Sequence, residues 1–177
     1  MSTDRVLAGK KAKAVGSYFE DMISYSCRLY EDNGIAKIEK QNEPIHYIRS
    51  LNRGQFIANF AKKSGVDYKG VLKGGKTICF ECKHTDNNSI PKARVESHQL
   101  QYMNDMANFG ALCFVVVSFR LERFYVIPLK VWTNMQTIYG RVSLKEELIQ
   151  EFKVPKINAH GVDFLASIDR GINSNDA

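Results

Sequence analysis

The spacing of apolar residues predicts that helices and strands alternate along this chain. Between residues 14 and 32, apolar side chains recur every three or four positions, which is typical of an amphipathic helix, and Asn33-Gly34 supplies a stop signal. Residues 111–119 form an almost continuous apolar run, as expected for a strand that is covered on both faces of a sheet. The pattern therefore predicts an α/β protein built around a buried sheet.

Turn residues divide the rest of the chain into shorter elements. Asn52-Arg53-Gly54 suits a three-residue hairpin loop in which Gly54 adopts a positive φ, and Gly74-Gly75 marks a second hairpin. The remaining predicted elements are strands at 35–39, 44–51, 55–62 and 123–129, a hairpin over 66–85, a helix over 95–108, and further helices after residue 130, where Ser143 to Glu146 resembles a capping box. We predict a basic flexible arm over residues 1–12, one domain over 13–171 and a disordered tail over 172–177.

Composition and charge limit the classes of function. With 177 residues and 44% hydrophobic content, the chain can bury one core but is short for two domains. The net charge of +6 favours a polyanionic partner such as nucleic acid. No apolar run reaches the length of a bilayer span, and no signal-peptide core follows the lysines at 10, 11 and 13. We therefore expect a cytoplasmic protein without a membrane partner.

Basic residues gather in two parts of the chain that we predict to bind DNA. The first is the N-terminal arm, and the second is the hairpin over residues 44–62, whose pattern is not cleanly amphipathic. This hairpin is either a solvated edge hairpin or a protruding element, since aromatic residues are interleaved with its basic ones. The predicted DNA-binding residues are Lys10 and Lys11 in the arm, and Arg49, Arg53, Lys62 and Lys63 in the hairpin.

Two of the four cysteines form a C-x-x-C sequence that resembles a metal or redox motif. Cys79 and Cys82 lie, however, in a segment with the composition of a strand. Residues three apart on a strand point to opposite faces, so these thiols cannot share one ion. We expect all four cysteines to be reduced and mostly buried.

The candidate chemistry lies in the hairpin over residues 66–85. Glu81 and Lys83 are two apart on the predicted strand and therefore share one face. If the loop has two residues, Asp67 pairs with Cys82 and points to the apolar face. If the loop has three residues, Asp67 pairs with Glu81, and the apolar residues share the opposite face. Burial favours the second register, because a slip of one residue exchanges the faces completely.

Two neighbouring carboxylates repel each other unless a cation lies between them. Oxygen ligands of this kind suit Mg²⁺, which keeps several waters and leaves coordination positions for a phosphate. A bound ion would lower the pKa of a water and polarise a phosphodiester, while Lys83 would stabilise the charge that develops on the phosphate. The simpler alternative is a solvated strand face with an ordinary ion pair between Glu81 and Lys83.

Asp67 followed by a hairpin and then Glu81-x-Lys83 resembles the signature of PD-(D/E)XK nucleases, although Val66 stands where that motif has proline. The wider sequence is similar to RecU-type Holliday junction resolvases over residues 10–130. The motifs that carry this resemblance are Gly16-x-x-Phe-Glu20, Asp67-Tyr-x-Gly-Val71, the aromatic before Glu81, Lys83 with Thr85, His98-Gln99, and the run from Phe114 to Phe119.

The resemblance implies a restriction-endonuclease-like mixed β-sheet flanked by helices, with a protruding β-hairpin stalk. It also implies that Asp67, Glu81 and the backbone carbonyl of Cys82 bind Mg²⁺, which Mn²⁺ would replace, and that Lys83 is catalytic. Glu20 is an auxiliary acidic residue by this resemblance, or else a solvated helix carboxylate. Gln99 contacts the phosphate or a metal-bound water, or else is a helix-surface amide.

By the same resemblance the chain is a homodimeric Holliday junction resolvase of a bacterial or phage-infected cell. It would make paired, symmetric cuts in four-way DNA junctions during recombination and repair, alongside recombinase and branch-migration proteins. One alternative is another structure- or sequence-selective endonuclease on the same fold. The other alternative is a non-catalytic, DNA-binding regulator of recombination.

Overall fold

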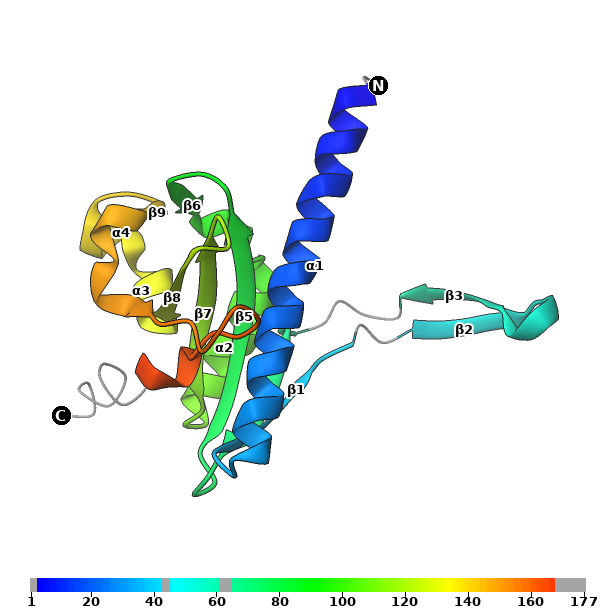
Figure 1. Cartoon of the computed structure of the whole chain (residues 1–177), viewed down its shortest axis with the longest axis horizontal. Helices are drawn as coiled ribbons and strands as arrows, with labels where there is room; N and C mark the ends of the chain where they lie inside the picture. Colours follow the sequence, from blue (N-terminus) through cyan, green and yellow to red (C-terminus); the bar gives the residue numbers. More distant parts are fainter. Residues whose placement is uncertain (1–2, 43–44, 61–64, 168–177) are drawn as a thin grey trace.

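A six-stranded mixed sheet forms the centre of the computed structural model, which describes residues 3–42, 45–60 and 65–167 (Figure 1). The strand order is β1-β4-β5-β7-β8-β10, in which β5 and β7 run parallel and the other neighbours are antiparallel. The strands are β1 Ala36–Lys40, β4 Tyr68–Leu72, β5 Thr77–Thr85, β7 Leu112–Phe119, β8 Arg123–Pro128 and β10 Lys153–Val154.

Helices cover both faces of this sheet. Helix α1 (Thr3–Asp32) packs on one face, and α2 (Ser97–Asn108) and α3 (Leu129–Thr133) pack on the other. Along β7, Phe114 and Val116 join the core beneath α1, whereas Val115 and Val117 join the core beneath α2. A strand buried on both faces has no solvent side for polar residues, which explains its continuous apolar run. The predicted α/β fold with a mixed sheet flanked by helices is confirmed.

Helix α1 is longer than the sequence pattern predicted. It begins at Thr3, so the structure replaces the predicted flexible arm over residues 1–12 with helix from Thr3 onward. This part of the chain is rich in lysine, alanine and other good helix formers and contains no proline, so nothing stops the helix from continuing. Its N-terminal part extends beyond the sheet (Figure 1), with Lys10 and Lys11 exposed. The predicted tail over 172–177 lies outside the described residues.

Strands β2 (Ile45–Ser50) and β3 (Phe56–Phe60) form a separate hairpin that stands away from the six-stranded sheet (Figure 1). We call residues 45–60 the stalk. A 3-10 turn at Asn52–Gly54 joins its strands, and Gly54 has the predicted positive φ, at 74°. At its base, the backbone N–H of Gln41 donates to the carbonyl of Asp67 (2.7 Å). The stalk is therefore part of a long insertion between Gln41 and Asp67, two residues that are hydrogen-bonded to each other.

The C-terminal third is less helical than predicted. Ser143 does not begin a helix but opens strand β9 (Ser143–Lys145), which pairs with β6 (Ser89–Pro91). Leu144 is fully buried opposite Ile90, and this pairing with a distant segment outweighs the local capping-box pattern. The other short elements are helix α4 (Met135–Tyr139) and 3-10 turns at Lys92–Arg94, Glu146–Leu148, Gln150–Phe152 and Phe164–Ser167. Among the described residues, no helix is long and apolar enough to cross a membrane.

Replacing Gly70 by alanine is expected to destabilise the fold by about 2–4 kcal/mol. Gly70 lies on β4 where β1 approaches so closely that a Cβ would stand 2.2 Å from the carbonyl oxygen of Lys37 and 2.7 Å from Cα of Ile38. Both are backbone atoms and cannot move aside cheaply. Urea denaturation measures the change, with Gly16→Ala as the matched control. A Cβ at Gly16 meets nothing within 4 Å, so alanine in helix α1 should stabilise by about 0.5–1 kcal/mol. Equal effects of the two substitutions would contradict this account of Gly70.

Candidate active site

The pairing of β4 with β5 brings the candidate catalytic residues together. Tyr68 lies opposite Phe80, and a three-residue loop closes the hairpin, with the Leu72 N–H donating to the carbonyl of Lys76 (2.8 Å). Tyr68 and Phe80 are fully buried and stack with ring centroids 5.0 Å apart. The register that burial favoured is therefore confirmed. Because side chains alternate along β5, Glu81 and Lys83 point away from this aromatic core, toward the side of the sheet that carries α2.

Asp67, Glu81 and Lys83 form one connected group in this hairpin. The backbone N–H of Asp67 donates to Glu81 Oε1 (3.0 Å), and the backbone N–H of Cys82 donates to Asp67 Oδ2 (2.8 Å). Lys83 Nζ lies 2.7 Å from Glu81 Oε2 and 3.9 Å from Asp67 Oδ2. The backbone thus fixes both carboxylates, and one ammonium lies close to both of them.

Burial controls the electrostatics of this group. Glu81 has no exposed surface, and this burial raises the pKa of its carboxyl to about 8 despite the opposing effect of the Lys83 ammonium. For Lys83, burial acts to lower the pKa, but the Glu81 and Asp67 carboxylates outweigh that effect and raise it. The buried carboxylate therefore depends on nearby positive charge to remain ionised.

The donor set of this group suits a hard cation with few protein ligands. No three or more His, Cys, Asp or Glu side chains in the described ranges are grouped to hold a metal ion. The predicted set is smaller, since it consists of the two carboxylates of Asp67 and Glu81 and the backbone carbonyl of Cys82. Mg²⁺ is commonly bound by one or two carboxylates and keeps several waters. Each carboxylate oxygen also accepts more than one contact, so the contacts to Lys83 and Cys82 leave acceptor capacity for an ion.

The cysteines are not part of this donor set through their thiols. Cys79 belongs to the core beneath α2 and Cys82 to the core beneath α1, so the two side chains lie on opposite faces of the sheet, as predicted. All four cysteines are buried and free of disulfides. The Cys79 and Cys113 sulfurs lie 3.2 Å apart on the neighbouring strands β5 and β7.

Two further predicted residues, Glu20 and Gln99, make contacts with residues outside the group. The Glu20 carboxylate lies 2.8 Å from Lys40 Nζ, and its backbone carbonyl accepts a hydrogen bond from the Tyr68 hydroxyl (2.8 Å). The Gln99 amide oxygen accepts the backbone N–H of Glu96 (2.9 Å) and so caps the start of α2. The contact between Glu20 and Lys40 leaves no signal in the sequence, because it depends on how α1 packs against β1.

The predicted DNA-binding residues are distributed over two parts of the surface. Lys10 and Lys11 are exposed on α1, and Arg49 and Arg53 are exposed on the stalk. Lys62 and Lys63 lie outside the described residues. The stalk also exposes large apolar side chains, which are Ile45, Tyr47, Ile48, Leu51 and Phe56, each more than 40% exposed.

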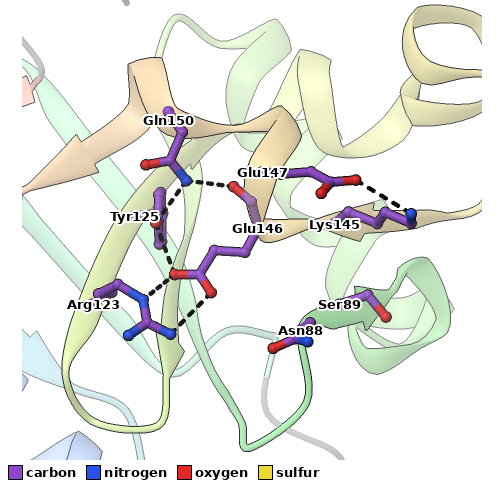
Figure 2. Close-up of a pocket in the computed structure, with 8 residues that line it drawn as sticks. All are labelled: Asn88, Ser89, Arg123, Tyr125, Lys145, Glu146, Glu147 and Gln150. Atoms are coloured by element: carbon purple, nitrogen blue, oxygen red, sulfur yellow. Dashed lines mark hydrogen bonds and ion pairs between the residues drawn. The ribbon is translucent and has the colours of Figure 1, made fainter.

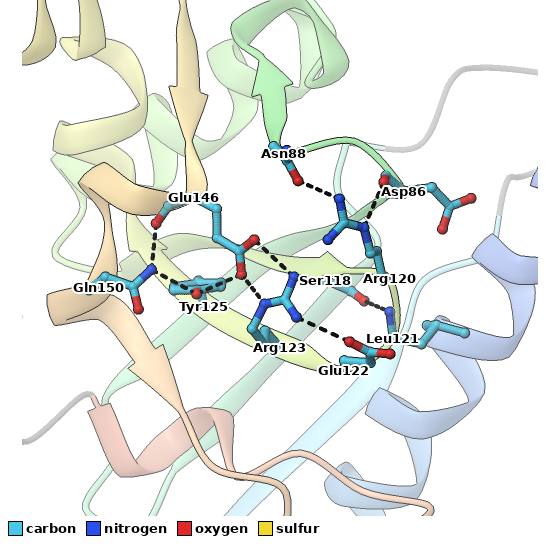
Figure 3. Close-up of polar contacts among 10 residues, drawn as sticks. All are labelled: Asp86, Asn88, Ser118, Arg120, Leu121, Glu122, Arg123, Tyr125, Glu146 and Gln150. Carbon is cyan, nitrogen blue, oxygen red and sulfur yellow. Dashed lines mark hydrogen bonds and ion pairs between the residues drawn. The ribbon is translucent and has the colours of Figure 1, made fainter.

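A pocket of about 570 Å³ lies between β8 and the segment that follows β9 (Figure 2). Its charged residues are paired: Arg123 Nη2 donates to Glu146 Oε2 (3.1 Å), the Tyr125 hydroxyl donates to Glu146 Oε1 (2.9 Å), and Lys145 contacts Glu147 (3.2 Å). Figure 3 shows the adjoining Arg120, which contacts the Asn88 side chain and donates to the carbonyl of Asp86 (3.1 Å). With its positive charges neutralised from within, this pocket is poorly suited to bind a polyanion.

Comparison with known proteins gives a consistent set of relatives. The family profile described as "RecU: Recombination protein U" matches residues 14–170. The Holliday junction resolvase RecU of Geobacillus kaustophilus is 29% identical over 166 residues, which cover 87% of this chain and 82% of that protein. The Holliday junction resolvase RecU of Streptococcus sanguinis is 32% identical, over 79% and 74% of the two chains. Among solved structures, the Holliday junction resolvase Hjc of Archaeoglobus fulgidus matches with a TM-score of 0.42 and 13% identity, over 76% of this chain and 86% of that one.

Proposed function

Because this chain belongs to the RecU family, we propose that it is a Holliday junction resolvase, an endonuclease that cuts four-way DNA junctions. The observation that carries this proposal is the connected group of Asp67, Glu81 and Lys83, within a match that spans most of the chain. A vestigial site has no chemical reason to keep a buried carboxylate beside an ammonium. The same group therefore favours an active nuclease over a regulator that only binds DNA.

The reaction is magnesium-dependent, with Asp67, Glu81 and the carbonyl of Cys82 as the ligands of the ion, and Mn²⁺ as a substitute. When bound, the ion polarises the phosphodiester and lowers the pKa of a water molecule. The chain's own contribution is to hold the ligands in place, since backbone N–H groups orient both carboxylates. Lys83, fixed 2.7 Å from Glu81, stabilises the negative charge that develops on the phosphate.

Two residues have supporting roles in this proposal. Gln99 lies at the start of α2 with its amide oxygen used for capping, and its amide nitrogen contacts the phosphate or a bound water. Glu20 is an auxiliary acid, held beside β1 by Lys40. Neither residue contacts the reacting atoms as directly as the three residues of the hairpin.

DNA binding involves both parts of the surface that carry the predicted basic residues. The stalk enters the junction, where Arg49 and Arg53 contact phosphates and the exposed rings pack against unpaired bases. Lys10 and Lys11 extend the contact along α1, and Lys62 and Lys63 complete the basic set. The net charge of +6 supports this assignment.

The active protein is a homodimer, and it works beside recombinase and branch-migration proteins. A junction is resolved only when two strands of like polarity are cut, and one chain supplies one set of Asp67, Glu81 and Lys83. A two-fold dimer also matches the approximate two-fold symmetry of the junction. Paired, symmetric cuts follow from this arrangement.

Incubation with Mg²⁺ and a synthetic four-way junction is expected to give paired, symmetric nicks, while linear duplex, single strand and flap DNA stay largely intact. Gel analysis of end-labelled strands measures the cuts, and sedimentation of the same preparation measures the dimer. EDTA should stop cleavage, and Ca²⁺ should permit binding without cutting. Equal cleavage of all four DNAs would favour a general endonuclease on this fold. Binding without cleavage in both Mg²⁺ and Mn²⁺ would favour a non-catalytic regulator.

A further inference from the structure

One edge of the sheet beside the candidate active site is not covered by α2. Helix α2 packs on β5 and β7, whereas β4 and the edge strand β1 border a shallow groove of about 290 Å³. The groove is lined by Lys37, Glu39, Gln41, Lys69, Gly70 and Val71. Gln41 is bonded through its backbone to Asp67, so the groove begins next to the catalytic group.

Lys69 lies on the side of the sheet that carries α2, together with Glu81. It pairs with Cys79 across the hairpin, and Glu81 is two positions further along β5, so these side chains share one side of the sheet. Asp67 lies two residues before Lys69, and its backbone N–H donates to Glu81. A nucleic acid strand bound at Asp67 and Glu81 therefore has Lys69 next to it.

Among the described residues, no ion pair joins Lys69 to a carboxylate, and Glu39, which lies opposite Lys69 on β1, contacts Lys37 instead (3.9 Å). The Lys69 ammonium lies 4.4 Å from the centroid of the Tyr102 ring on α2. The other lysines nearby are engaged, since Lys37 contacts Glu31 and Lys40 pairs with Glu20. Lys69 is thus available to contact an anion that enters the groove, next to the Glu39 carboxylate.

The position of the Tyr102 ring is fixed by a glycine. A Cβ on Gly65 would lie 2.7 Å from Cδ2 of Tyr102, so the ring packs directly against the backbone two residues before Asp67. Tyr102 therefore contacts both the segment that leads into Asp67 and the ammonium of Lys69. An aromatic ring in this place restricts the lysine to the groove without removing its charge.

We propose that Lys69 binds a phosphate of the cleaved DNA strand adjacent to the scissile phosphate, and that Tyr102 positions Lys69 for this contact. The inference rests on the proposed function, because it takes the Asp67, Glu81 and Lys83 group as the place of cleavage. It deepens that function by assigning the path of the substrate strand across β4 toward β1.

The test compares Lys69→Met with Lys73→Met, which removes an exposed lysine from the tip of the same hairpin. In Ca²⁺ buffer, gel shifts with the four-way junction are expected to show about a 3- to 10-fold rise in Kd for Lys69→Met. They should also show a salt-dependence slope smaller by about 0.9, as expected when one phosphate contact is lost. With Mg²⁺ at saturating protein, the cleavage rate should fall less than the affinity does. Lys73→Met should change none of these quantities.

Tyr102 is tested by a conservative and a disruptive substitution. Tyr102→Phe keeps the ring and should bind like the unaltered protein, whereas Tyr102→Leu should reproduce part of the Lys69→Met defect, with the fold checked by circular dichroism. An unchanged Kd and salt slope for Lys69→Met would overturn the inference while leaving the resolvase assignment intact. Failure of the unaltered protein to cut junctions would instead overturn the proposed function, because the binding measurements with Lys69→Met do not depend on cleavage.

Discussion

Asp67→Asn is expected to abolish junction cleavage, with a loss of at least about 10²–10³-fold, while junction binding survives. Asparagine has the shape of aspartate and presents a carbonyl oxygen to the Cys82 N–H, which now donates to Asp67 Oδ2 at 2.8 Å. The hairpin should therefore keep its register. Only the negative charge is lost, and with it half of the carboxylate pair that we propose to hold Mg²⁺. Binding should be unchanged or slightly tighter, because one repulsion toward the phosphates disappears.

Single-turnover cleavage and gel shifts on the same protein preparations separate these two effects. The matched control is Asp32→Asn, which makes the same chemical change at an exposed carboxylate at the end of α1. Circular dichroism and thermal denaturation verify that both variants are folded. If Asp67→Asn loses binding and cleavage in equal measure while folded, the carboxylate contributes to DNA binding rather than to the reaction. Cleavage near the normal rate would remove Asp67 from the catalytic group.

Replacement of the stalk, residues 45–60, by a short Gly-Ser turn is expected to remove the preference for four-way junctions over duplex. The side chains of the stalk are largely exposed and contribute little to either core, so the six-stranded sheet should remain folded. We expect the ratio of junction to duplex affinity to fall at least about tenfold, which corresponds to about 1.4 kcal/mol. Competition gel shifts with both DNAs measure this ratio directly.

Arg53→Ala is the smallest change that addresses the same question, because Arg53 lies in the turn at the tip of the stalk. Arg28→Ala, at an exposed arginine on α1, is its matched control. Arg53→Ala should lower the affinity for junctions more than that for duplex, and Arg28→Ala should affect neither. A stalk replacement that keeps the original affinity ratio would show that junction recognition lies in another part of the protein.

The hairpin of the candidate site was predictable because burial allows one register. Tyr68 and Phe80 must face the core, and a slip of one residue would expose both rings and bury Asp67. The continuous apolar run of β7 gave a similarly clear signal, since residues from both of its faces are buried. Predictions succeeded where the side chains of one local segment decided the structure.

The remaining features depend on contacts between distant segments. Ser143 to Glu146 has the residues of a capping box, yet Leu144 gains more by pairing with Ile90 across 54 positions of sequence. The amide oxygen of Gln99 also caps α2, a role that was not predicted because it depends on where the helix begins. The contact between Tyr102 and Gly65 brings α2 against the segment before Asp67 and has no counterpart in the periodicity of either segment.

The bond between Gln41 and Asp67 has a consequence for how proteins of this kind diversify. The chain leaves the sheet at Gln41 and returns at Asp67 with its backbone already closed by one hydrogen bond of 2.7 Å. The two ends of the intervening segment are thus held together by the sheet, and doubling the length of this segment costs only about 0.6 kcal/mol of loop-closure entropy. The role in junction recognition that we propose for the stalk would therefore allow insertions and deletions to change DNA recognition without altering Asp67, Glu81 and Lys83. On the same proposal, grafting this segment into another nuclease at an equivalent strand edge would transfer a preference for four-way junctions.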